Sequence, residues 1–282
     1  MPIIGAHVSA AGGVSNAVSR GLNIGASAIM FFGASPRQFA VNLPPKDEIE
    51  KFKKDFKASG LKAAFMHGPY IANITSAKPN SRAVAAGILA KHYEIADALG
   101  IDGLIFHVGS PGKDGDREEA IKFAIEGIKK ILAKVDTKVS LIMESASGGA
   151  KIGSQPEDMG KIMKSVKSPR LKLCIDTAHS FEAGLLEYTA KGVKSFFDTW
   201  EKAAGKGSVV CLHANDSMSE FASLYDRHEN IGKGHIGLQG FVQLAKDPRV
   251  KNLPWLLEVP GYDDKGPDKK NVDILRKTVK GK

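Results

Sequence analysis

Short hydrophobic runs alternate along the chain with longer stretches whose apolar residues recur at helical spacing. The runs are almost continuously apolar, which is typical of parallel β-strands covered on both faces. Eight runs are predicted as strands: residues 3–8, 28–33, 63–68, 103–109, 139–145, 171–177, 208–215 and 255–261. Amphipathic stretches separate them, so the pattern indicates a strand–helix unit that repeats eight times.

The helical stretches carry start and stop signals. Asp116 and Ser154 each precede a glutamate by three residues, which predicts capping boxes at Asp116–Glu119 and Ser154–Glu157. Gly60 and Gly100 follow their helical stretches and are expected to end them, since glycine adopts the left-handed conformation that terminates helices. These signals support the alternation of strands and helices.

Eight strand–helix units with right-handed crossovers close into a (β/α)8 TIM barrel. We expect one α/β domain over residues 1–282, because no linker rich in Pro, Gly or Ser divides the chain. An open doubly wound sheet is the alternative, but it usually has fewer strands and would place a nucleotide-binding loop early in the chain. The longest irregular stretch, roughly residues 216–237, follows the seventh strand, and long loops at this position tend to carry function.

Histidines and carboxylates gather where the predicted strands end. In a barrel, the C-terminal ends of the strands converge on one face, and the active site is built there. The candidate cluster contains His67, His107, Glu144, Asp176, His179, His213, Asp226, His228 and Glu258. Six of the nine end different strands, His179 follows Asp176 by three residues, and Asp226 and His228 lie in the long loop.

This residue set predicts a centre that holds several metal ions. Neutral imidazoles and carboxylates suit zinc and its neighbours in the divalent series. Four carboxylates aimed into one cavity need cations, because burying uncompensated charge is unfavourable. Metal-assisted hydrolysis is therefore the leading hypothesis. His7 ends the first strand and is expected to hydrogen-bond a ligand or a phosphate, whereas His92, beside Lys91 and Glu94, is expected at the surface.

Composition bears on partners and location. The formal net charge is +9, which favours polyanionic partners such as nucleic acid. No stretch reaches the ~18 apolar residues that a membrane helix needs, so we expect no membrane association. Cys174 and Cys211 lie in apolar runs and are expected as buried thiols, which fits a reducing, cytoplasmic location. Residues 232–237 match a dinucleotide fingerprint, but they do not open the first strand–helix unit, so no nucleotide site is predicted.

The chain resembles the endonuclease IV family of abasic-site DNA repair enzymes along nearly its full length. Two of the most telling segments are Cys174-Ile-Asp-Thr-Ala-His179 and His213-Ala-Asn-Asp216. The others are residues 5–13, 36–39, 67–70, 106–110, 226–228, 231–237 and 257–258. Together these segments are highly specific, although no single one is.

The resemblance implies three zinc ions per chain. It assigns His67 and His107 to the first zinc, and Asp176, His213 and Glu258 to the second, with Glu144 bridging the two. It assigns His179, Asp226 and His228 to the third zinc. Every ligand position of the family is matched, and each zinc keeps a position open, as catalytic sites require.

The resemblance also implies the reaction and its substrate. The expected substrate is double-stranded DNA that contains abasic sites or blocked 3′ ends, cut 5′ to the abasic site to leave a 3′-hydroxyl and a 5′-deoxyribose phosphate. Glu144 and Glu258 are the candidate catalytic carboxylates, and Arg37 and Tyr70 are expected on loops that enter the DNA. Nothing in the sequence demands more than a monomer.

Four positions depart from the family pattern: Pro69, Ser145, Gly149 and Val259. They affect the surroundings of the ligands and the expected DNA contacts, and none removes a ligand. The competing hypothesis is a metal-dependent sugar isomerase or epimerase on the same barrel, which typically uses one or two metals. A non-catalytic nucleic-acid-binding barrel is the third possibility, and the full set of nine ligand positions argues against it.

Overall fold

The computed structural model describes residues 1–34, 41–113 and 115–280, and in it eight parallel strands close into a barrel. The strands are β1 (Ile3–His7), β2 (Ala28–Phe32), β3 (Ala64–His67), β4 (Gly103–His107), β5 (Ser140–Glu144), β6 (Leu171–Asp176), β7 (Val209–His213) and β10 (Pro254–Leu257). β1 pairs with both β2 and β10, which closes the ring. The predicted TIM barrel is confirmed, each predicted strand is present, and the open sheet is excluded.

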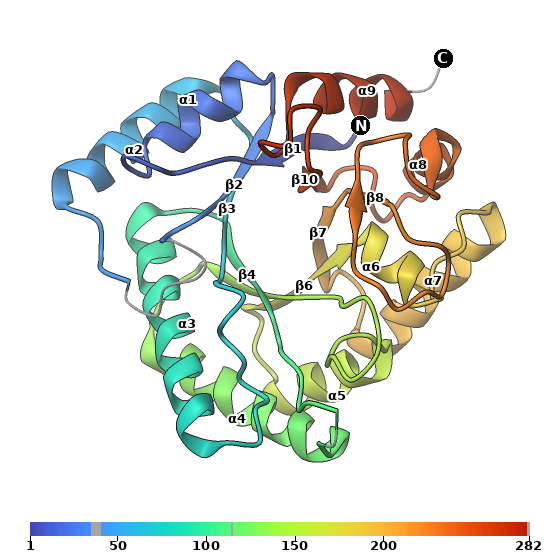
Figure 1. Ribbon diagram of the computed structural model, residues 1–282. Helices are drawn as coiled ribbons and strands as arrows, with labels where there is room; N and C mark the ends of the chain where they lie inside the picture. The colour runs from blue at the N-terminus through green and yellow to red at the C-terminus, as the bar shows by residue number, and fades with distance from the viewer. Residues whose placement is uncertain (35–40, 114, 281–282) are drawn as a thin grey trace.

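The helices form an outer layer around the strands (Figure 1). They are α1 (Asn16–Asn23), α2 (Lys46–Ser59), α3 (Pro79–Leu99), α4 (Arg117–Lys134), α5 (Pro156–Val166), α6 (Thr177–Glu182), α7 (Ala190–Ala204), α8 (Gly237–Ala245) and α9 (Lys269–Lys280). Within the described ranges, no helix combines the length and the apolar character needed to cross a membrane.

Two apolar clusters follow from the alternation of side chains along each strand. The larger one joins outward-facing residues such as Phe31 and Leu104 to the buried faces of the helices. The smaller one fills the barrel interior and contains Ala28, Met30, Ala63, Phe65, Ile105, Ile142, Cys174, Cys211 and Leu256. Both cysteines are buried and free, as predicted. The interior cluster therefore forms an apolar base beneath the C-terminal mouth of the barrel.

Most of the predicted helix signals are confirmed. The Asp116 side chain accepts a hydrogen bond from the Glu119 amide and caps α4. Gly60 and Gly100 end α2 and α3 with φ values of 76° and 67°. The cap predicted at Ser154 is wrong, because α5 begins after Gln155, and the Ser154 hydroxyl donates to the carbonyl of Lys151.

The surface position predicted for His92 is also wrong. His92 lies on the buried face of α3, and its Nδ1 donates to the Ile88 carbonyl at 2.9 Å. His92 lies four residues after Ile88 and three after Leu89, so it continues the inner stripe of the helix. The charged neighbours misled the prediction, because adjacent residues on a helix face different directions.

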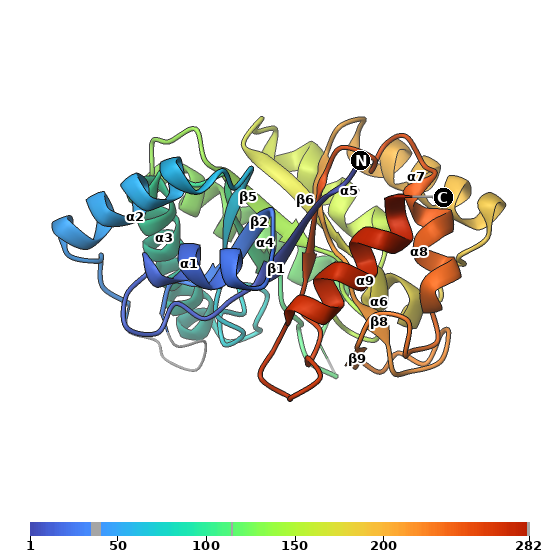
Figure 2. The ribbon, with the colours of Figure 1, turned by 90° about the horizontal axis from the view of Figure 1, so that it is seen from above.

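The loop after β7 runs from Asp216 to α8 and is mostly irregular, as predicted. It contains one short antiparallel pair, β8 (Asp216–Ser217) with β9 (His228–Glu229), both labelled in Figure 2. The Asp216 carboxylate accepts backbone N–H groups from Gly232, Ile236 and Gly237. This side chain occupies amides that a nucleotide phosphate would otherwise use, which is consistent with the prediction that the glycine motif is not a nucleotide site.

Two helical glycines provide a matched test of the helix layer. A Cβ on Gly160 of α5 would lie 2.6 Å from the Ala203 carbonyl oxygen of α7, whereas a Cβ on Gly87 of α3 meets nothing within 4 Å. We expect Gly160→Ala to destabilise the protein by about 1–3 kcal/mol through overpacking. Gly87→Ala should stabilise it by about 0.5–1 kcal/mol through helix propensity. Denaturant unfolding of both variants measures the difference, and equal effects would contradict the close approach of α5 and α7.

Candidate metal centre

The side chains at the site continue the inward-facing rows of the barrel strands. His67 lies two residues after Phe65, and Glu144 lies two residues after Ile142, so each faces the barrel axis above an interior apolar residue. The same spacing holds for His107, Asp176, His213 and Glu258, which follow Ile105, Cys174, Cys211 and Leu256. Strand geometry alone thus directs six of the nine predicted residues toward one point.

Glu144 lies at the centre of the cluster. Its Oε2 is 2.9 Å from His67 Nε2 and 3.4 Å from His107 Nδ1. Its Oε1 is 2.9 Å from His213 Nδ1 and 3.5 Å from His179 Nδ1. The two oxygens face different histidines, so this carboxylate can be shared between two neighbouring cations.

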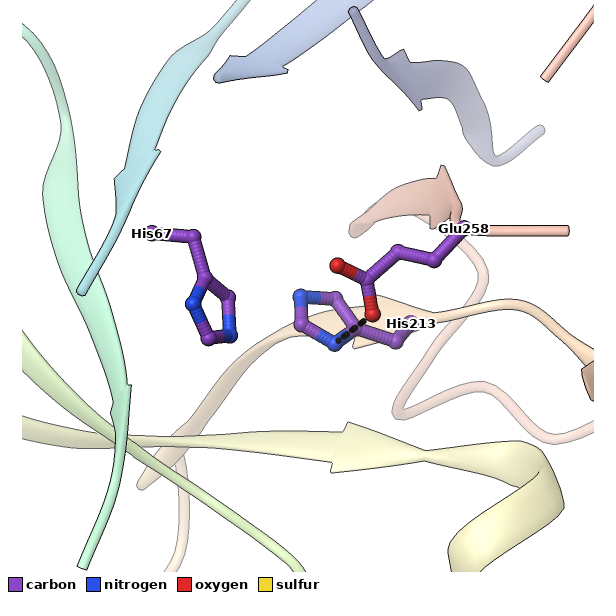
Figure 3. Close-up of side chains that lie close together, drawn as sticks. All are labelled: His67, His213 and Glu258. Carbon is purple, nitrogen blue, oxygen red and sulfur yellow. Dashed lines mark ion pairs between the residues drawn. The ribbon is translucent and has the colours of Figure 1, made fainter. Parts of the chain in front are cut away.

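Three carboxylates converge on one nitrogen of His213. Besides Glu144, the Glu258 Oε2 lies 3.0 Å from His213 Nδ1, and the Asp176 Oδ2 lies 3.8 Å from it. Figure 3 shows His213 between His67 and Glu258, with the ion pair to Glu258 drawn. One imidazole N–H cannot satisfy several carboxylate oxygens, so this point of the structure requires further positive charge.

The tautomers of two histidines indicate metal ligation. His67 Nδ1 lies 2.7 Å from the Gly68 carbonyl, and His179 Nδ1 lies 2.9 Å from the Ser145 carbonyl. Each Nδ1 must donate, because a carbonyl only accepts. In the neutral rings the Nε2 lone pairs therefore face carboxylate oxygens, on Glu144 for His67 and on Asp226 for His179. A lone pair and a carboxylate attract only through a cation or a proton between them, which fits metal ligands whose other nitrogen is fixed by a carbonyl.

The donor atoms form four sets, and within each set all the atoms lie within 4.8 Å of one another. They are His67, His107 and Glu144; Glu144, Asp176, His213 and Glu258; His67, His213 and Glu258; and Asp176, His179 and His228. Asp226 joins the last set, since its Oδ1 is 3.2 Å from His179 Nε2. His228 Nε2 is buried without a hydrogen-bond partner among the described residues, which leaves it free to bind an ion. The structure thus brings all nine predicted residues together.

The charges of the cluster shift its pKa values strongly. Burial would raise the pKa of Glu144, but the charges of His107 and His213 outweigh it and hold the pKa well below its ordinary value. Burial would likewise lower the pKa of His213, but Glu258 and Glu144 raise it well above its ordinary value. For His107 burial prevails and lowers the pKa to about 4. Glu144 is therefore held ionised, which is the state that binds metal.

Two further residues support the positions of Asp176 and Glu258: Asn215, to which sequence reasoning gave no role, and Ser145. Asn215 donates to Asp176 Oδ2 at 2.8 Å, and its Oδ1 accepts the Glu258 amide at 2.7 Å. Ser145, one of the departures from the family pattern, accepts the Asp176 amide at 2.9 Å. Asn215 follows His213 by two residues and is fully buried, so the alternation of the strand continued past its end was the available signal.

The three remaining predicted residues differ in their positions. His7 Nδ1 lies 3.1 Å from Glu258 Oε1, beside the cluster as expected. Tyr70 is exposed, with its ring 5.7 Å from that of His67 and stacked at 5.9 Å on that of His107. Arg37 lies outside the described residues, so its predicted DNA contact stays a prediction.

Two cavities open over the cluster. The first, of about 700 Å³, is lined by residues that include His107, Lys151, His179 and His228. The second, of about 840 Å³, is lined on the other side by residues that include His7. Tyr70, Glu258 and Pro260 line both, so Tyr70 stands at the boundary between them. This arrangement presents one buried metal-type cluster to a broad opening at the barrel mouth.

Known proteins resemble this chain over its full length. A family described as a xylose isomerase-like TIM barrel matches residues 19–278. A probable endonuclease 4 of Nitratidesulfovibrio vulgaris is 33% identical over 99% of this chain and 100% of its own. One of Persephonella marina is 32% identical over 98% and 97%. The crystal structure of endonuclease IV from Thermus thermophilus superposes with a TM-score of 0.84 at 28% identity, covering 99% of each chain.

One buried carboxylate near the cluster has no place among the donors. Glu182 of α6 is fully buried, and its Oε1 accepts the Ser217 hydroxyl at 2.8 Å and the Arg227 amide at 3.1 Å. Oε2 has no hydrogen-bond partner among the described residues. Burial raises the pKa of Glu182 to about 7. Because Arg227 lies between Asp226 and His228, this contact fixes the loop that carries both.

Replacing Glu182 by glutamine should change the pH dependence of stability. The folded protein keeps the Glu182 proton up to about pH 7, whereas an unfolded glutamate loses it near its ordinary pKa of 4.5. The contribution of Glu182 to stability therefore falls between these pH values as the pH rises. We expect Glu182→Gln to be more stable than wild type by about 2–3 kcal/mol above pH 7, and similar to it below pH 4.5. Urea unfolding in chelator-containing buffer from pH 4 to 8 measures this.

Glu187→Gln is the matched control, because Glu187 is an exposed glutamate just beyond α6. Its difference from wild type should not vary with pH. A constant difference for Glu182→Gln would contradict the raised pKa.

Proposed function

Because the chain belongs to the endonuclease IV family, we propose that it is a DNA repair endonuclease that cuts the phosphodiester bond 5′ to abasic sites. The products are a 3′-hydroxyl and a 5′-deoxyribose phosphate, and the same site removes blocking groups from 3′ ends. The observation that carries the proposal is the convergence of five histidines and four carboxylates at one barrel mouth. A net charge of +9 is consistent with a polyanionic substrate.

We propose three zinc ions per chain. The first set of ligands is His67 and His107, the second is Asp176, His213 and Glu258, with Glu144 shared between them, and the third is His179, Asp226 and His228. Nitrogen and oxygen donors of this kind suit zinc. Bound zinc would supply Lewis acidity, which lowers the pKa of bound water strongly, toward about 7, and stabilises charge on a phosphate.

The protein's own groups divide the remaining work. The Glu144 side chain is fully buried and lies within 3.5 Å of four histidines, so it would hold zinc together with the first two sets of ligands. Glu258 lines both cavities, and its Oε1 contacts His7 while its Oε2 contacts His213. It is therefore the carboxylate better placed to accept the proton of an attacking water. His7 would hold that carboxylate in position and share the proton.

Recognition depends on the low free energy needed to extrude an abasic sugar from the DNA duplex, because the sugar carries no base that must be unstacked. The cavity beside the cluster, about 700 Å³, has room for a sugar and its phosphates. Tyr70 is exposed at its edge, where an aromatic ring can stack on a neighbouring base. We expect the enzyme to act as a monomer.

The runner-up is a sugar isomerase or epimerase. A D-tagatose 3-epimerase-like protein superposes with a TM-score of 0.74 at 16% identity, which shows a shared fold alone. The set of His179, Asp226 and His228 favours the nuclease, because it adds donors for an ion beyond the one or two that isomerases typically use. Metal stoichiometry separates the two functions.

The decisive test is cleavage of a duplex oligonucleotide with a single abasic site. We expect one incision 5′ to the site and three zinc ions per chain by elemental analysis. Chelator treatment should reduce cleavage to background. Glu144→Gln should reduce the cleavage rate by more than ~100-fold, which exceeds the reduction typical of residues that only hydrogen-bond a metal ligand. Full activity in the chelated protein, or one or two metals with sugar turnover, would overturn the proposal.

Tyr70 should discriminate abasic from intact DNA. Loss of one base–aromatic stack weakens binding by roughly 5- to 100-fold. We expect Tyr70→Ala to lose this much affinity for abasic duplex and much less for intact duplex. Tyr262→Ala is the matched control, since Tyr262 is also exposed but lines neither cavity. Equal losses on both duplexes would contradict the stacking role.

A further inference from the structure

A lysine lies among the metal-type side chains of the 700 Å³ cavity. The Nζ of Lys151 is 2.9 Å from Asp226 Oδ2 and 2.8 Å from the Ser147 hydroxyl. An ammonium group has three N–H donors, and these two contacts use two of them. The side chain remains 44% exposed, so its charge is open to the cavity. Lys151 therefore has one donor left for a ligand.

The backbone that carries Lys151 is held firmly. The Ile152 amide donates to the Gly109 carbonyl at 2.9 Å, which ties the loop after β5 to the loop after β4. On the other side, Arg117 is paired with Asp158 and donates to the Lys151 carbonyl at 3.4 Å. A lysine mounted this way has a restricted range of positions. Its ammonium group is therefore held in the cavity and does not move freely in solvent as most surface lysines do.

The charge distribution shows what Lys151 can bind. Lys151 and Arg227 are the Lys and Arg side chains among the described residues that line this cavity, and Arg227 lies over the ring of Tyr225. Asp226 contacts Lys151 through Oδ2 and His179 through Oδ1. One carboxylate can therefore serve a metal and the lysine at once. Lys151 adds a fixed positive charge beside the third ligand set.

We propose that Lys151 is a phosphate-binding residue that contacts a non-bridging oxygen of the bound DNA strand on the Asp226 side of the cavity. This inference rests on the proposed function of the same site. A compact ammonium suits a phosphate oxygen as a point charge. The contact places negative charge of the substrate next to His179, Asp226 and His228 and so positions the strand for cleavage. The competing role is purely structural, in which Lys151 only orients Asp226.

Lys151→Gln and Lys151→Arg test the proposal, with Lys164→Gln as the control. Lys164 is an exposed lysine on α5, outside the cavity. The probe is the nicked product duplex, which cannot be cut again, titrated against zinc-loaded protein over a range of KCl concentrations. A lost charged contact weakens binding roughly tenfold, and the slope of log Kd against log salt falls by about one. We expect this for Lys151→Gln, with recovery in Lys151→Arg and little change in Lys164→Gln.

Zinc content distinguishes the two roles. A phosphate-binding lysine leaves three zinc ions in Lys151→Gln, whereas loss of one zinc with an unchanged salt slope would overturn the proposal in favour of a structural role. Equal behaviour of Lys151→Gln and Lys164→Gln would also overturn it. Inorganic phosphate, titrated by calorimetry into each zinc-loaded protein, tests the contact without DNA cleavage. Wild-type protein that binds phosphate through Lys151 but leaves abasic DNA intact would refute the proposed function and not the anion contact.

Discussion

The mutual repulsion of buried carboxylates is the constraint on which the site depends. Glu144, Asp176 and Glu258 approach a single nitrogen of His213 at the mouth of an apolar barrel. Imidazole protons neutralise part of this charge, as the raised pKa values of His213 and His179 show after the opposing effect of burial. Divalent cations neutralise it more completely. The donor set is therefore stable as a group only when positive charge is present, which links the fold of this region to metal binding.

The barrel makes this concentration of charge possible. Its interior is filled by apolar side chains that include Cys174, Cys211 and Leu256, and six of the donors follow such residues by two positions along the same strands. The apolar base keeps water from solvating the carboxylates from below, which strengthens each contact above it. Asn215 then donates to the Asp176 carboxylate and accepts the Glu258 amide, and Ser145 accepts the Asp176 amide, so these hydrogen bonds fix the backbone that carries both carboxylates.

The sequence predicted much of this arrangement, because strand positions and strand ends follow from local patterns. The eight strands could be placed from apolar runs, their closure from the alternation with helical stretches, and six donors from the histidines and carboxylates at the strand ends. His92 and Ser154 were misplaced because neighbouring charges and a capping pattern are weak signals beside tertiary packing. Glu182 and Lys151 could not be found in advance, since Ser217, the hydroxyl partner of Glu182, lies 35 residues away and Asp226, the carboxylate partner of Lys151, lies 75 residues away. Such pairings exist only after the chain has folded.

The third donor set differs from the other two in what supports it. His67, Glu144 and His213 come from strands, and their side chains are almost completely buried. Asp226 comes from a loop, and its side chain is 39% exposed. Its position depends on contacts made within and beneath that loop: Asp216 holds the glycine segment, Glu182 holds the Arg227 amide, and Lys151 holds Asp226 itself. The strands thus determine the first two sets directly, whereas the third is determined by side chains that must themselves be correctly charged. Substitutions in the loops around this set are therefore expected to change the position of its donors more readily than substitutions in the barrel strands.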